Sequence, residues 1–230
     1  MFMRIVLGSC FRNSSRNRHL DRYFAQARGL RDALRKHGDV LRLVSVEGDS
    51  RDDTRIQLIG CAERDVLSFE LVTRNHGCKE WGSVESAERM EKLSYVLNGM
   101  MEAIHQEDEV LIYVESDLVW EPDTFVRLID QLKVGVDVIA PLIFAGDHFY
   151  DVWAFRKNGA RFGPFSPYHS ELNHNELTMV DSVGSCLVMR AEVARHCRSI
   201  DGEALVGFCR DVWAKHYSVY CDARERIHHP

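Results

Sequence analysis

Short runs of apolar residues alternate along this chain with longer segments in which apolar residues recur every third or fourth position. The short runs are typical of β-strands and the periodic segments of amphipathic helices, because a helix repeats about every 3.6 residues. The pattern predicts strands at 4–8, 40–46, 66–73, 110–114, 136–141, 179–189 and 217–221. It predicts helices at 17–36, 54–61, 85–105, 124–132, 191–196 and 205–216. A strand, a helix and a second strand at the start of the chain, with a polar loop after each strand, indicate a βαβ unit of an α/β fold.

The run from Val110 to Val114 is the best candidate for a strand buried on both faces. It ends abruptly in Glu115-Ser116-Asp117, and Glu121-Pro122 then begins a predicted helix. A buried parallel strand brings the residues after it to the carboxyl edge of the sheet, where open α/β sheets bind ligands. Two carboxylates there form a hard oxygen site suited to Mg²⁺ or Mn²⁺ with a bound diphosphate. The alternative is a polar loop that only ends a strand.

Residues 144–175 break the alternating pattern, because they are rich in aromatic residues, Gly, Pro and His. Such a segment predicts a substrate-facing loop with short strands rather than long amphipathic elements. The chain contains no linker composition, repeat or low-complexity run. We therefore expect a single domain.

The composition narrows the class of protein. With 230 residues, 45% of them hydrophobic and 28% charged, the chain can bury a sizeable core and is not expected to be disordered. A net charge of −6 argues against a protein that mainly wraps duplex DNA. The charge is uneven, since residues 1–40 hold nine Lys and Arg against three acids, whereas residues 107–131 hold eight acids against one Arg. A basic segment near an acidic metal-binding loop suits a phosphate-bearing ligand.

Cysteine usage and hydropathy indicate the compartment. The seven cysteines are scattered and have no C-x-x-C spacing, which favours a reducing compartment over a zinc site or a disulfide framework. No apolar stretch approaches the ~20 residues of a membrane span, and the apolar run at the first residues is shorter than a signal peptide. We therefore expect a cytoplasmic protein.

Two motifs carry a resemblance to a known family. The turn from Glu47 to Thr54, with the sequence EGDSRDDT, and the Glu115-Ser116-Asp117 triplet follow the order of the nucleotide-binding turn and the Asp-x-Asp motif of GT-A glycosyltransferases. The chain resembles this family over nearly its whole length, and it is most similar to family-2-type enzymes and to fungal mannan-polymerase and capsule-associated mannosyltransferases. The resemblance implies an α/β fold with a mixed, mostly parallel central sheet flanked by helices. It also implies one domain, with a nucleotide-sugar-binding half at 1–117 and an acceptor-binding half at 118–230.

The same resemblance implies roles on the donor side. Glu47, with Asp49 and Ser50, is expected near the base and ribose, where a short carboxylate accepts hydrogen bonds from hydroxyl or N–H groups. Arg89 and Lys92, about one helical turn apart, are expected to neutralise the donor diphosphate. The alternatives are an Asp-rich turn that caps the next helix and two solvated cations on a helix face.

The metal ligands that the resemblance implies are Asp117, Glu115 and His229. The family usually carries Asp at the first acidic position, where this chain has Glu115, so Asp117 is the safer ligand. Ser116 lies between the two acids and is expected to contact the donor. His229 matches the distal His of the family by its Ile-x-His-Pro context, and His228 is the alternative ligand. A His so near a chain end is often only a surface residue.

The acceptor side is implied by three later segments. Residues 150–153, Tyr-Asp-Val-Trp, resemble a stretch of the capsule-type mannosyltransferases, and residues 181–186 resemble a glycine-containing run of the mannan-polymerase group. Asp211 lies where family-2-type enzymes carry their catalytic Asp. Asp151, Asp181 and Asp211 are thus the candidate bases of an inverting reaction, whereas a retaining reaction, which the mannosyltransferase matches favour, needs no such base. Aromatic residues and carboxylates suit a carbohydrate site, although a buried strand explains the aromatic residues equally.

The sequence therefore predicts an Mn²⁺- or Mg²⁺-dependent transferase that moves a sugar from a nucleotide-diphosphate donor to a hydroxyl acceptor, either a glycan or a modified base in DNA. One alternative is a sugar-1-phosphate nucleotidylyltransferase, which needs a glycine-rich loop after the first strand, whereas residues 8–15 are poor in glycine. Another alternative is a non-catalytic sugar- or nucleic-acid-binding module on the same fold.

Overall fold

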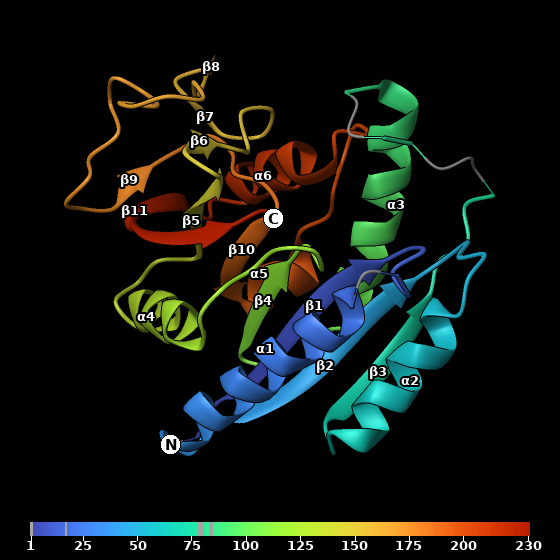
Figure 1. Cartoon of the computed structure of the whole chain (residues 1–230). Helices are drawn as coiled ribbons and strands as arrows, with labels where there is room; N and C mark the ends of the chain where they lie inside the picture. Colours follow the sequence, from blue (N-terminus) through green and yellow to red (C-terminus); the bar gives the residue numbers. More distant parts are fainter. Residues whose placement is uncertain (1, 17, 78–80, 83–84) are drawn as a thin grey trace.

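The computed structural model, which describes residues 2–16, 18–77, 81–82 and 85–230, contains a mixed β-sheet between two layers of helices (Figure 1). The sheet strands are β1 (Arg4–Phe11), β2 (Val40–Glu47), β3 (Ser68–Thr73), β4 (Val110–Val114), β5 (Val138–Ala145), β6 (His148–Phe149), β9 (Thr178–Met179), β10 (Cys186–Arg190) and β11 (Val219–His228). Their order in the described sheet is β3-β2-β1-β4-β10-β5-β11-β9, with β6 paired to β5.

Most long strands of the described sheet run in one direction, whereas β10 in the middle and the short strands β9 and β6 run against their neighbours. The first four strands in the order run parallel to one another, and β11 runs parallel to β5. Between these two groups lies β10, which is antiparallel to both β4 and β5. The predicted fold class, an α/β fold with a mixed, mostly parallel central sheet flanked by helices, is confirmed.

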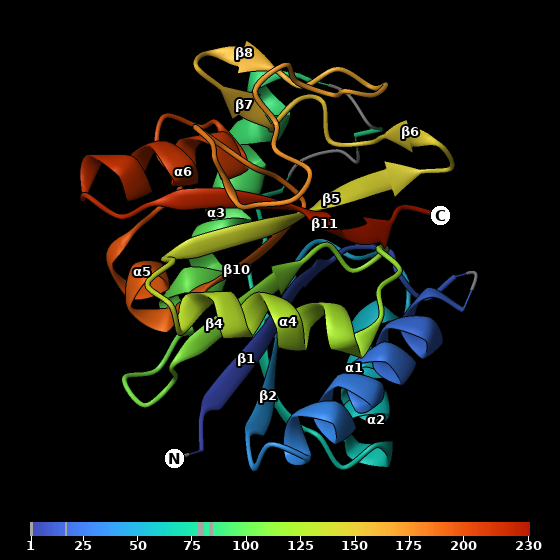
Figure 2. The same ribbon diagram turned by 90° about the vertical axis from the view of Figure 1, so that its left-hand side faces the viewer.

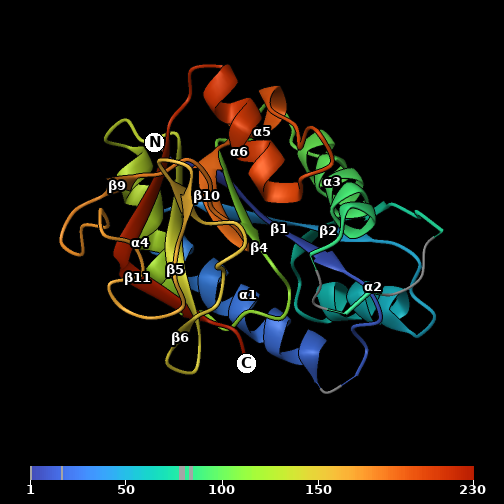
Figure 3. The same ribbon diagram turned by 90° about the horizontal axis from the view of Figure 1, so that it is seen from above.

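Helices cover both faces of the sheet (Figure 3). One layer consists of α1 (His19–Arg35), α2 (Thr54–Arg64) and α4 (Pro122–Leu132), and the other of α3 (Ala87–Glu102), α5 (Ala191–His196) and α6 (Ala204–Ala214). Each layer encloses its own hydrophobic core. The helix α1 buries the predicted apolar stripe, which consists of Leu20, Tyr23, Phe24, Ala27, Leu30 and Leu34. Its periodic pattern is therefore explained by packing against the sheet.

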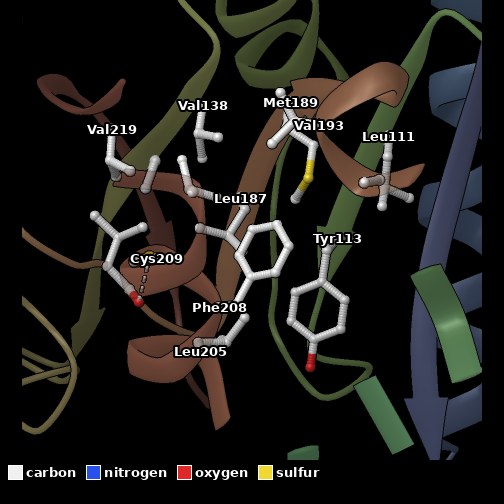
Figure 4. Close-up of a cluster of buried hydrophobic side chains, with 14 of the residues drawn as sticks. Leu111, Tyr113, Val138, Leu187, Met189, Val193, Leu205, Phe208, Cys209 and Val219 are labelled. Carbon is white, nitrogen blue, oxygen red and sulfur yellow. Dashed lines mark hydrogen bonds between the residues drawn. The ribbon is translucent and has the colours of Figure 1, made fainter. Parts of the chain in front are cut away.

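The strand β4 lies in the middle of the sheet and contributes to both cores. Val110, Ile112 and Val114 pack with the α1 and α4 side, whereas Leu111 and Tyr113 pack with the α3, α5 and α6 side. All five residues are buried, as the apolar run predicts. Figure 4 shows Leu111 and Tyr113 on the same face of the sheet as Leu187 and Phe208. The segment that follows β4 therefore begins from a rigid position.

The aromatic segment after β5 forms a loop region with short strands, as predicted (Figure 2). Its two-stranded sheet consists of β7 (Arg156–Lys157) and β8 (Ala160–Arg161). The last strand is longer than the predicted 217–221, because β11 continues through a register irregularity to His228. The charged residues that hid this continuation are paired, since Arg127 of α4 holds Glu225 at 2.6 Å and Arg224 holds Asp222 at 2.7 Å.

Other boundaries differ by a few residues. The helix predicted at 17–36 is found at His19–Arg35, and Asn17 lies outside the described residues. The strand predicted at 179–189 is divided into β9 and β10, because Ser185 has a positive φ of 41° that no strand accommodates. The six described cysteines are free thiols, and Cys78 is outside the described residues. None of the described helices has the length and hydrophobicity to cross a membrane, and the cytoplasmic location stays a prediction.

Candidate active site

The loop after β4 is held by three different parts of the sheet. Glu115 begins a turn that Leu118 closes by donating its N–H to the Glu115 carbonyl at 3.1 Å. The N–H of Glu115 itself donates to the carbonyl of Ser185, just before β10, at 2.8 Å. The next residue after the turn, Val119, exchanges two backbone hydrogen bonds with His228 of β11. The predicted Glu115-Ser116-Asp117 loop is thus a fixed turn at the carboxyl end of β4.

The Val119–His228 bridge brings the end of β11 to this turn. The His229 Nε2 atom lies 3.3 Å from the Asp117 Oδ2 atom, and the His229 ring stacks on Tyr150 with a centroid distance of 4.1 Å. The backbone N–H of His229 donates to the Phe144 carbonyl at 2.8 Å, which fixes the strand end. His228, the alternative ligand, is exposed on the strand. The structure therefore places His229 rather than His228 beside Asp117.

The pair formed by Asp117 and His229 fits two neighbouring ligand positions of a small divalent cation. Ligands at about 2.1 Å from an octahedral ion lie roughly 3 Å apart, close to the 3.3 Å between these atoms. Among the described residues no group of three His, Cys, Asp or Glu side chains is arranged to hold one metal ion. Mg²⁺ in proteins typically takes one or two carboxylates and completes its shell with water and substrate phosphate. The residues present therefore fit a metal ion that takes two ligands from the protein and the others from water and a phosphate group.

Two further carboxyl groups, of Glu115 and Asp151, lie beside the turn. Both are close to the Ser185 side chain, and all three residues line one cavity. Burial, followed by the charges of Asp117 and Asp151, raises the pKa of Glu115 to about 8. Burial raises the pKa of Asp151 to about 7. These carboxyl groups therefore ionise at a higher pH than an ordinary surface acid, and Asp151 can exchange a proton near neutral pH.

Asp151 is 8% exposed, and its Oδ2 atom has no hydrogen-bond partner among the described residues. Gly184 makes room for it, because a Cβ atom at position 184 would lie 2.6 Å and 2.8 Å from the two Asp151 oxygens. A buried polar atom without a partner costs free energy, and such atoms in native proteins commonly await a ligand or water. Asp151 therefore presents an unsatisfied acceptor at a prepared position.

Two adjoining cavities meet at this loop. The smaller, about 360 Å³, is lined by residues that include the cations Arg12, Arg89 and Lys92, and Asp117 lies on its wall. The larger, about 720 Å³, is lined by Tyr150, Asp151, Trp153, Gly184, Ser185 and residues of the α3 and α6 N-termini. Glu115 and Arg89 line both cavities. We call them the basic cavity and the aromatic cavity.

The predicted nucleotide turn after β2 is close to the basic cavity, but its acidic side chains have other partners. Glu47 is 4% exposed and accepts from the Ser50 N–H at 3.2 Å. Ser50 accepts from the Asn13 N–H at 3.1 Å. Asp49 accepts from the N–H groups of His76 and Gly77, and these bonds lower its pKa although burial alone would raise it. The turn therefore ties three loops together.

A glycine of that turn lines the basic cavity instead. Gly48 lies so close to Arg74 that a Cβ atom would fall 1.9 Å from the Arg74 carbonyl oxygen, which explains why no larger residue fits. Arg12, Asn13, His19, His76 and Trp81 also line this cavity, and none of them was predicted as a site residue. The basic loop after the first predicted strand was the available signal for Arg12 and Asn13.

The three candidate bases lie in different places. Asp151 lines the aromatic cavity, whereas the described linings of both cavities lack Asp181 and Asp211. The Asp181 carboxylate accepts from the Gly159 N–H at 2.7 Å. Asp211 is held by the Arg198 N–H and by Lys215, each at 2.7 Å. The structure thus brings only Asp151 of the three to the loop after β4.

Two acids that were not predicted from the sequence line the far wall of the aromatic cavity. They are Asp201 and Glu203, just before α6, and both pair with Arg210, at 2.7 Å and 2.5 Å. Glu85, before α3, also lines this cavity and pairs with Arg161 at 2.5 Å. The lining of the aromatic cavity is therefore richer in carboxylates than in cations.

No protein-family model matches the sequence, and a search of curated proteins finds no match. Solved structures share the fold. TarS 1–349 from S. aureus in complex with UDP superposes with a TM-score of 0.57 at 12% identity, covering 98% of this chain and 60% of that one. Against longer TarS the TM-score is 0.56 at 13% identity, with 96% of this chain and 37% of that chain covered. The chain thus spans about a third to three fifths of the TarS chains it matches.

Two other neighbours are covered almost completely. A Bacillus anthracis protein assigned as a glucose-1-phosphate thymidylyltransferase, solved with sucrose, gives a TM-score of 0.54 at 9% identity, covering 97% of this chain and 87% of that one. A 4-diphosphocytidyl-2C-methyl-D-erythritol synthase from Anaerococcus prevotii gives 0.52 at 9% identity, covering 99% and 88%. These likenesses show a GT-A-like fold of the kind found in glycosyltransferases and nucleotidyltransferases. The closer resemblance to mannan-polymerase and capsule-associated enzymes stays a prediction.

Proposed function

We propose that this chain is a metal-dependent glycosyltransferase that moves a sugar from a nucleoside-diphosphate donor to a hydroxyl acceptor. The observation that carries the proposal is the pair of adjoining cavities that share Glu115 and Arg89, with Asp117 on the wall of the basic one. A nucleotide-sugar has a charged nucleotide and a neutral sugar joined through a diphosphate. The basic cavity suits the nucleotide, the junction of the two cavities suits the diphosphate, and the aromatic cavity suits the sugar.

The basic cavity is the proposed nucleotide site. Its cations Arg12, Arg89 and Lys92 suit a diphosphate, and the rings of His76 and Trp81, 6.0 Å apart, offer apolar surface to a nucleobase. Its lining comes entirely from residues 10–117, which agrees with the nucleotide-sugar-binding half predicted at 1–117. The UDP complex of TarS adds support, because it places a nucleoside diphosphate on the same fold.

Asp117 and His229 are the proposed metal ligands, and Glu115, two residues earlier in the same turn, is the third candidate. A divalent cation bound there would offset negative charge on the leaving diphosphate. Arg89 contributes to the same task from the protein itself, because it lines both cavities beside Glu115. Glu47, Asp49 and Ser50 act one step further away, by holding the loops that shape the basic cavity.

The aromatic cavity is the proposed site of the transferred sugar and the acceptor. Tyr150 and Trp153 offer ring faces for sugar contacts, and the free Oδ2 of Asp151 accepts a hydrogen bond from a hydroxyl group. In the proposed reaction the acceptor oxygen attacks the anomeric carbon, and the bond to the diphosphate oxygen breaks with its electron pair. Asp151 accepts the hydroxyl proton as the acceptor oxygen attacks from the face opposite the diphosphate, and this single displacement inverts the anomeric carbon. Residues 118–230 supply most of this lining, which supports the proposal that they form the acceptor-binding half.

The carboxylates around the aromatic cavity favour a glycan acceptor over a base in DNA. Glu85, Asp201 and Glu203 would repel a polyanionic backbone, even though each is paired with an arginine. A nucleotidylyltransferase remains the second candidate, because two solved structures named for that activity share the fold. Release of pyrophosphate from a nucleoside triphosphate and a sugar 1-phosphate would favour it.

A thermal-shift panel tests the proposal. UDP, GDP, ADP and their sugar conjugates are each added with and without Mn²⁺, to wild type and to Asp117→Ala. A ligand present at 100 times its Kd stabilises the native state by about 2.7 kcal/mol. We expect one nucleotide to raise the Tm of the wild type only with Mn²⁺, and Asp117→Ala to lose that dependence. A metal effect that survives in Asp117→Ala would overturn the site, and a panel without any shift would overturn the proposed donor class.

A further inference from the structure

The turn after β4 leaves two backbone carbonyls without a partner from the turn itself. Ser116 and Asp117 occupy its two central positions, between the Glu115 carbonyl and the Leu118 N–H that close it. The closing bond satisfies neither central carbonyl. Buried carbonyls are nearly always paired in native proteins, so partners must come from outside the turn.

One face of α1 lies against the turn. The guanidinium of Arg22 donates from Nη2 to the Asp117 carbonyl at 2.8 Å. The ring of His19, one turn earlier on the helix, lies near Ser116, and both residues line the basic cavity. Residues three apart on a helix lie on the same face, so both side chains approach the turn from one side. Below the turn, the Ser9 hydroxyl donates to the Val114 carbonyl at 2.7 Å.

Asp117 is thus held at both ends. Its backbone carbonyl is held by α1, and its carboxylate lies against His229 at the end of β11. Rotation of the peptide that follows Asp117 would break the bond to Arg22 and would move the Asp117 Cα–Cβ direction away from His229. A bond from a charged donor is stronger than a neutral one, which suits a group that must fix a turn.

We propose that Arg22 is a positioning residue that sets the metal affinity of the Asp117–His229 pair by fixing the Asp117 peptide. This inference rests on the proposed function, because it assumes that the pair binds a divalent cation. Arg22 itself would contact neither the metal nor the sugar. Groups that orient metal ligands typically change metal affinity 10- to 100-fold when they are removed.

The same helix provides a matched control. Arg31 donates from Nη1 to the backbone carbonyl of Asp65, also at 2.8 Å, but Asp65 follows α2 and lines neither cavity in the described structure. Arg31→Gln therefore removes a bond of the same type and length from the same helix. A general loss of helix packing would affect Arg22→Gln and Arg31→Gln alike.

The experiment measures Mn²⁺ binding by electron paramagnetic resonance of the free ion, in excess UDP, for wild type, Asp117→Ala, Arg22→Gln, Arg22→Lys and Arg31→Gln. The metal-free Tm of each variant is recorded in parallel. We expect roughly tenfold weaker Mn²⁺ binding in Arg22→Gln, partial recovery in Arg22→Lys and unchanged binding in Arg31→Gln. The Asp117→Ala variant should lose the site.

The outcomes separate the two proposals. If wild type binds Mn²⁺ through Asp117 and Arg22→Gln binds it equally well, the role of Arg22 is wrong and the metal site stands. The role of Arg22 is also wrong if Arg31→Gln weakens Mn²⁺ binding as much as Arg22→Gln does. If wild type binds no Mn²⁺, or if Asp117→Ala binds it normally, the proposed metal site fails and the role of Arg22 fails with it.

Discussion

Two groups of carboxyl side chains lie at the loops of this molecule, and they have opposite surroundings. Asp52, after β2, accepts from the N–H and hydroxyl groups of both Ser15 and Thr54. Asp151, after β6, lies beside Glu115 and keeps one oxygen without a partner among the described residues. The hydrogen bonds outweigh burial and lower the pKa of Asp52 to about 2, whereas burial raises the pKa of Asp151 to about 7.

The difference shows which acids stabilise the fold and which are available to a ligand. A carboxylate with several donors contributes to folding and has little capacity left for a substrate. A buried carboxyl group with a free oxygen costs stability, and such groups cluster at functional sites. On this criterion the Asp52 group is structural and the Asp151 group is functional. The following experiments test that division, from the largest expected effect to the smallest.

The largest effect is expected for Asp151→Asn. The amide keeps the size of the side chain but cannot take a proton, so kcat should fall by roughly 10²- to 10⁴-fold. Stability should be unchanged or slightly higher, because the buried acid is gone. Steady-state kinetics and thermal melts check both parts. Asp181→Asn serves as the control, and an equal loss of kcat there would remove the distinction.

The next effect is expected for Gly184→Ala. The added methyl group would overlap the Asp151 oxygens and the Ala154 Cβ atom, which lies 2.5 Å from its position. Displacement of Asp151 should lower kcat/KM by at least about tenfold, and overpacking should cost about 1–3 kcal/mol. Gly60→Ala is the matched control, since a Cβ atom there meets nothing within 4 Å. Wild-type kinetics in Gly184→Ala would show that Asp151 needs no fixed position.

Asp52→Ala should act on stability alone. It removes the acceptor that joins the loop after β1 to the start of α2, and we expect a loss of about 1–2 kcal/mol with kcat/KM nearly unchanged. Chemical denaturation checks the free energy of unfolding. The neighbouring Asp53→Ala, on an exposed residue, should cost much less. A large loss of kcat/KM with normal stability would contradict the structural role of Asp52.

The smallest expected effect concerns pH, because Asp52 and Asp151 should change the stability of the protein with pH in opposite directions. The stability from Asp52 is complete above its ordinary pKa of 3.8 and is lost as pH falls toward about 2. The raised pKa of Asp151 has the opposite effect on stability. Its burial costs no stability below pH 3.8, where the carboxyl group is protonated in both the folded and the unfolded state. The cost grows as the pH rises to about 7 and is constant above that pH. Asp151→Asn should therefore stabilise the protein more at about pH 8 than at about pH 5. If the difference in unfolding free energy between Asp151→Asn and wild type is the same at both pH values, Asp151 is not a buried, ionisable group.

Sequence patterns predicted the framework well because burial leaves a periodic trace. The apolar run before Glu115 and the stripe of α1 both appear where the pattern placed them. The direction of the strands in the second half left no such trace. Residues 179–189 were therefore predicted as one strand, although β9 pairs at the sheet edge and β10 in the middle.

The placement of the acids was harder to predict, because spacing does not show which partners a side chain finds. The Asp211 carboxylate accepts hydrogen bonds from Lys215 and from the Arg198 N–H, whereas Asp201, ten residues earlier, lines the aromatic cavity. His229 was identified only through the resemblance. Its position depends on the long β11, in which Glu225 pairs with the distant Arg127 and Asp222 pairs with the nearby Arg224.

The reversed direction of β10 has a consequence for how the loop after β4 can change. Because this strand runs against its neighbours, the residues that enter it stand beside the residues that leave β4. One short stretch, Gly184 and Ser185, thereby contacts Asp151 and Glu115 together without a long excursion from the sheet. An insertion in that stretch would disturb the surroundings of both acids at once. The length of the chain between Gly184 and Cys186 is therefore constrained from two sides, by the sheet register and by the two carboxyl groups.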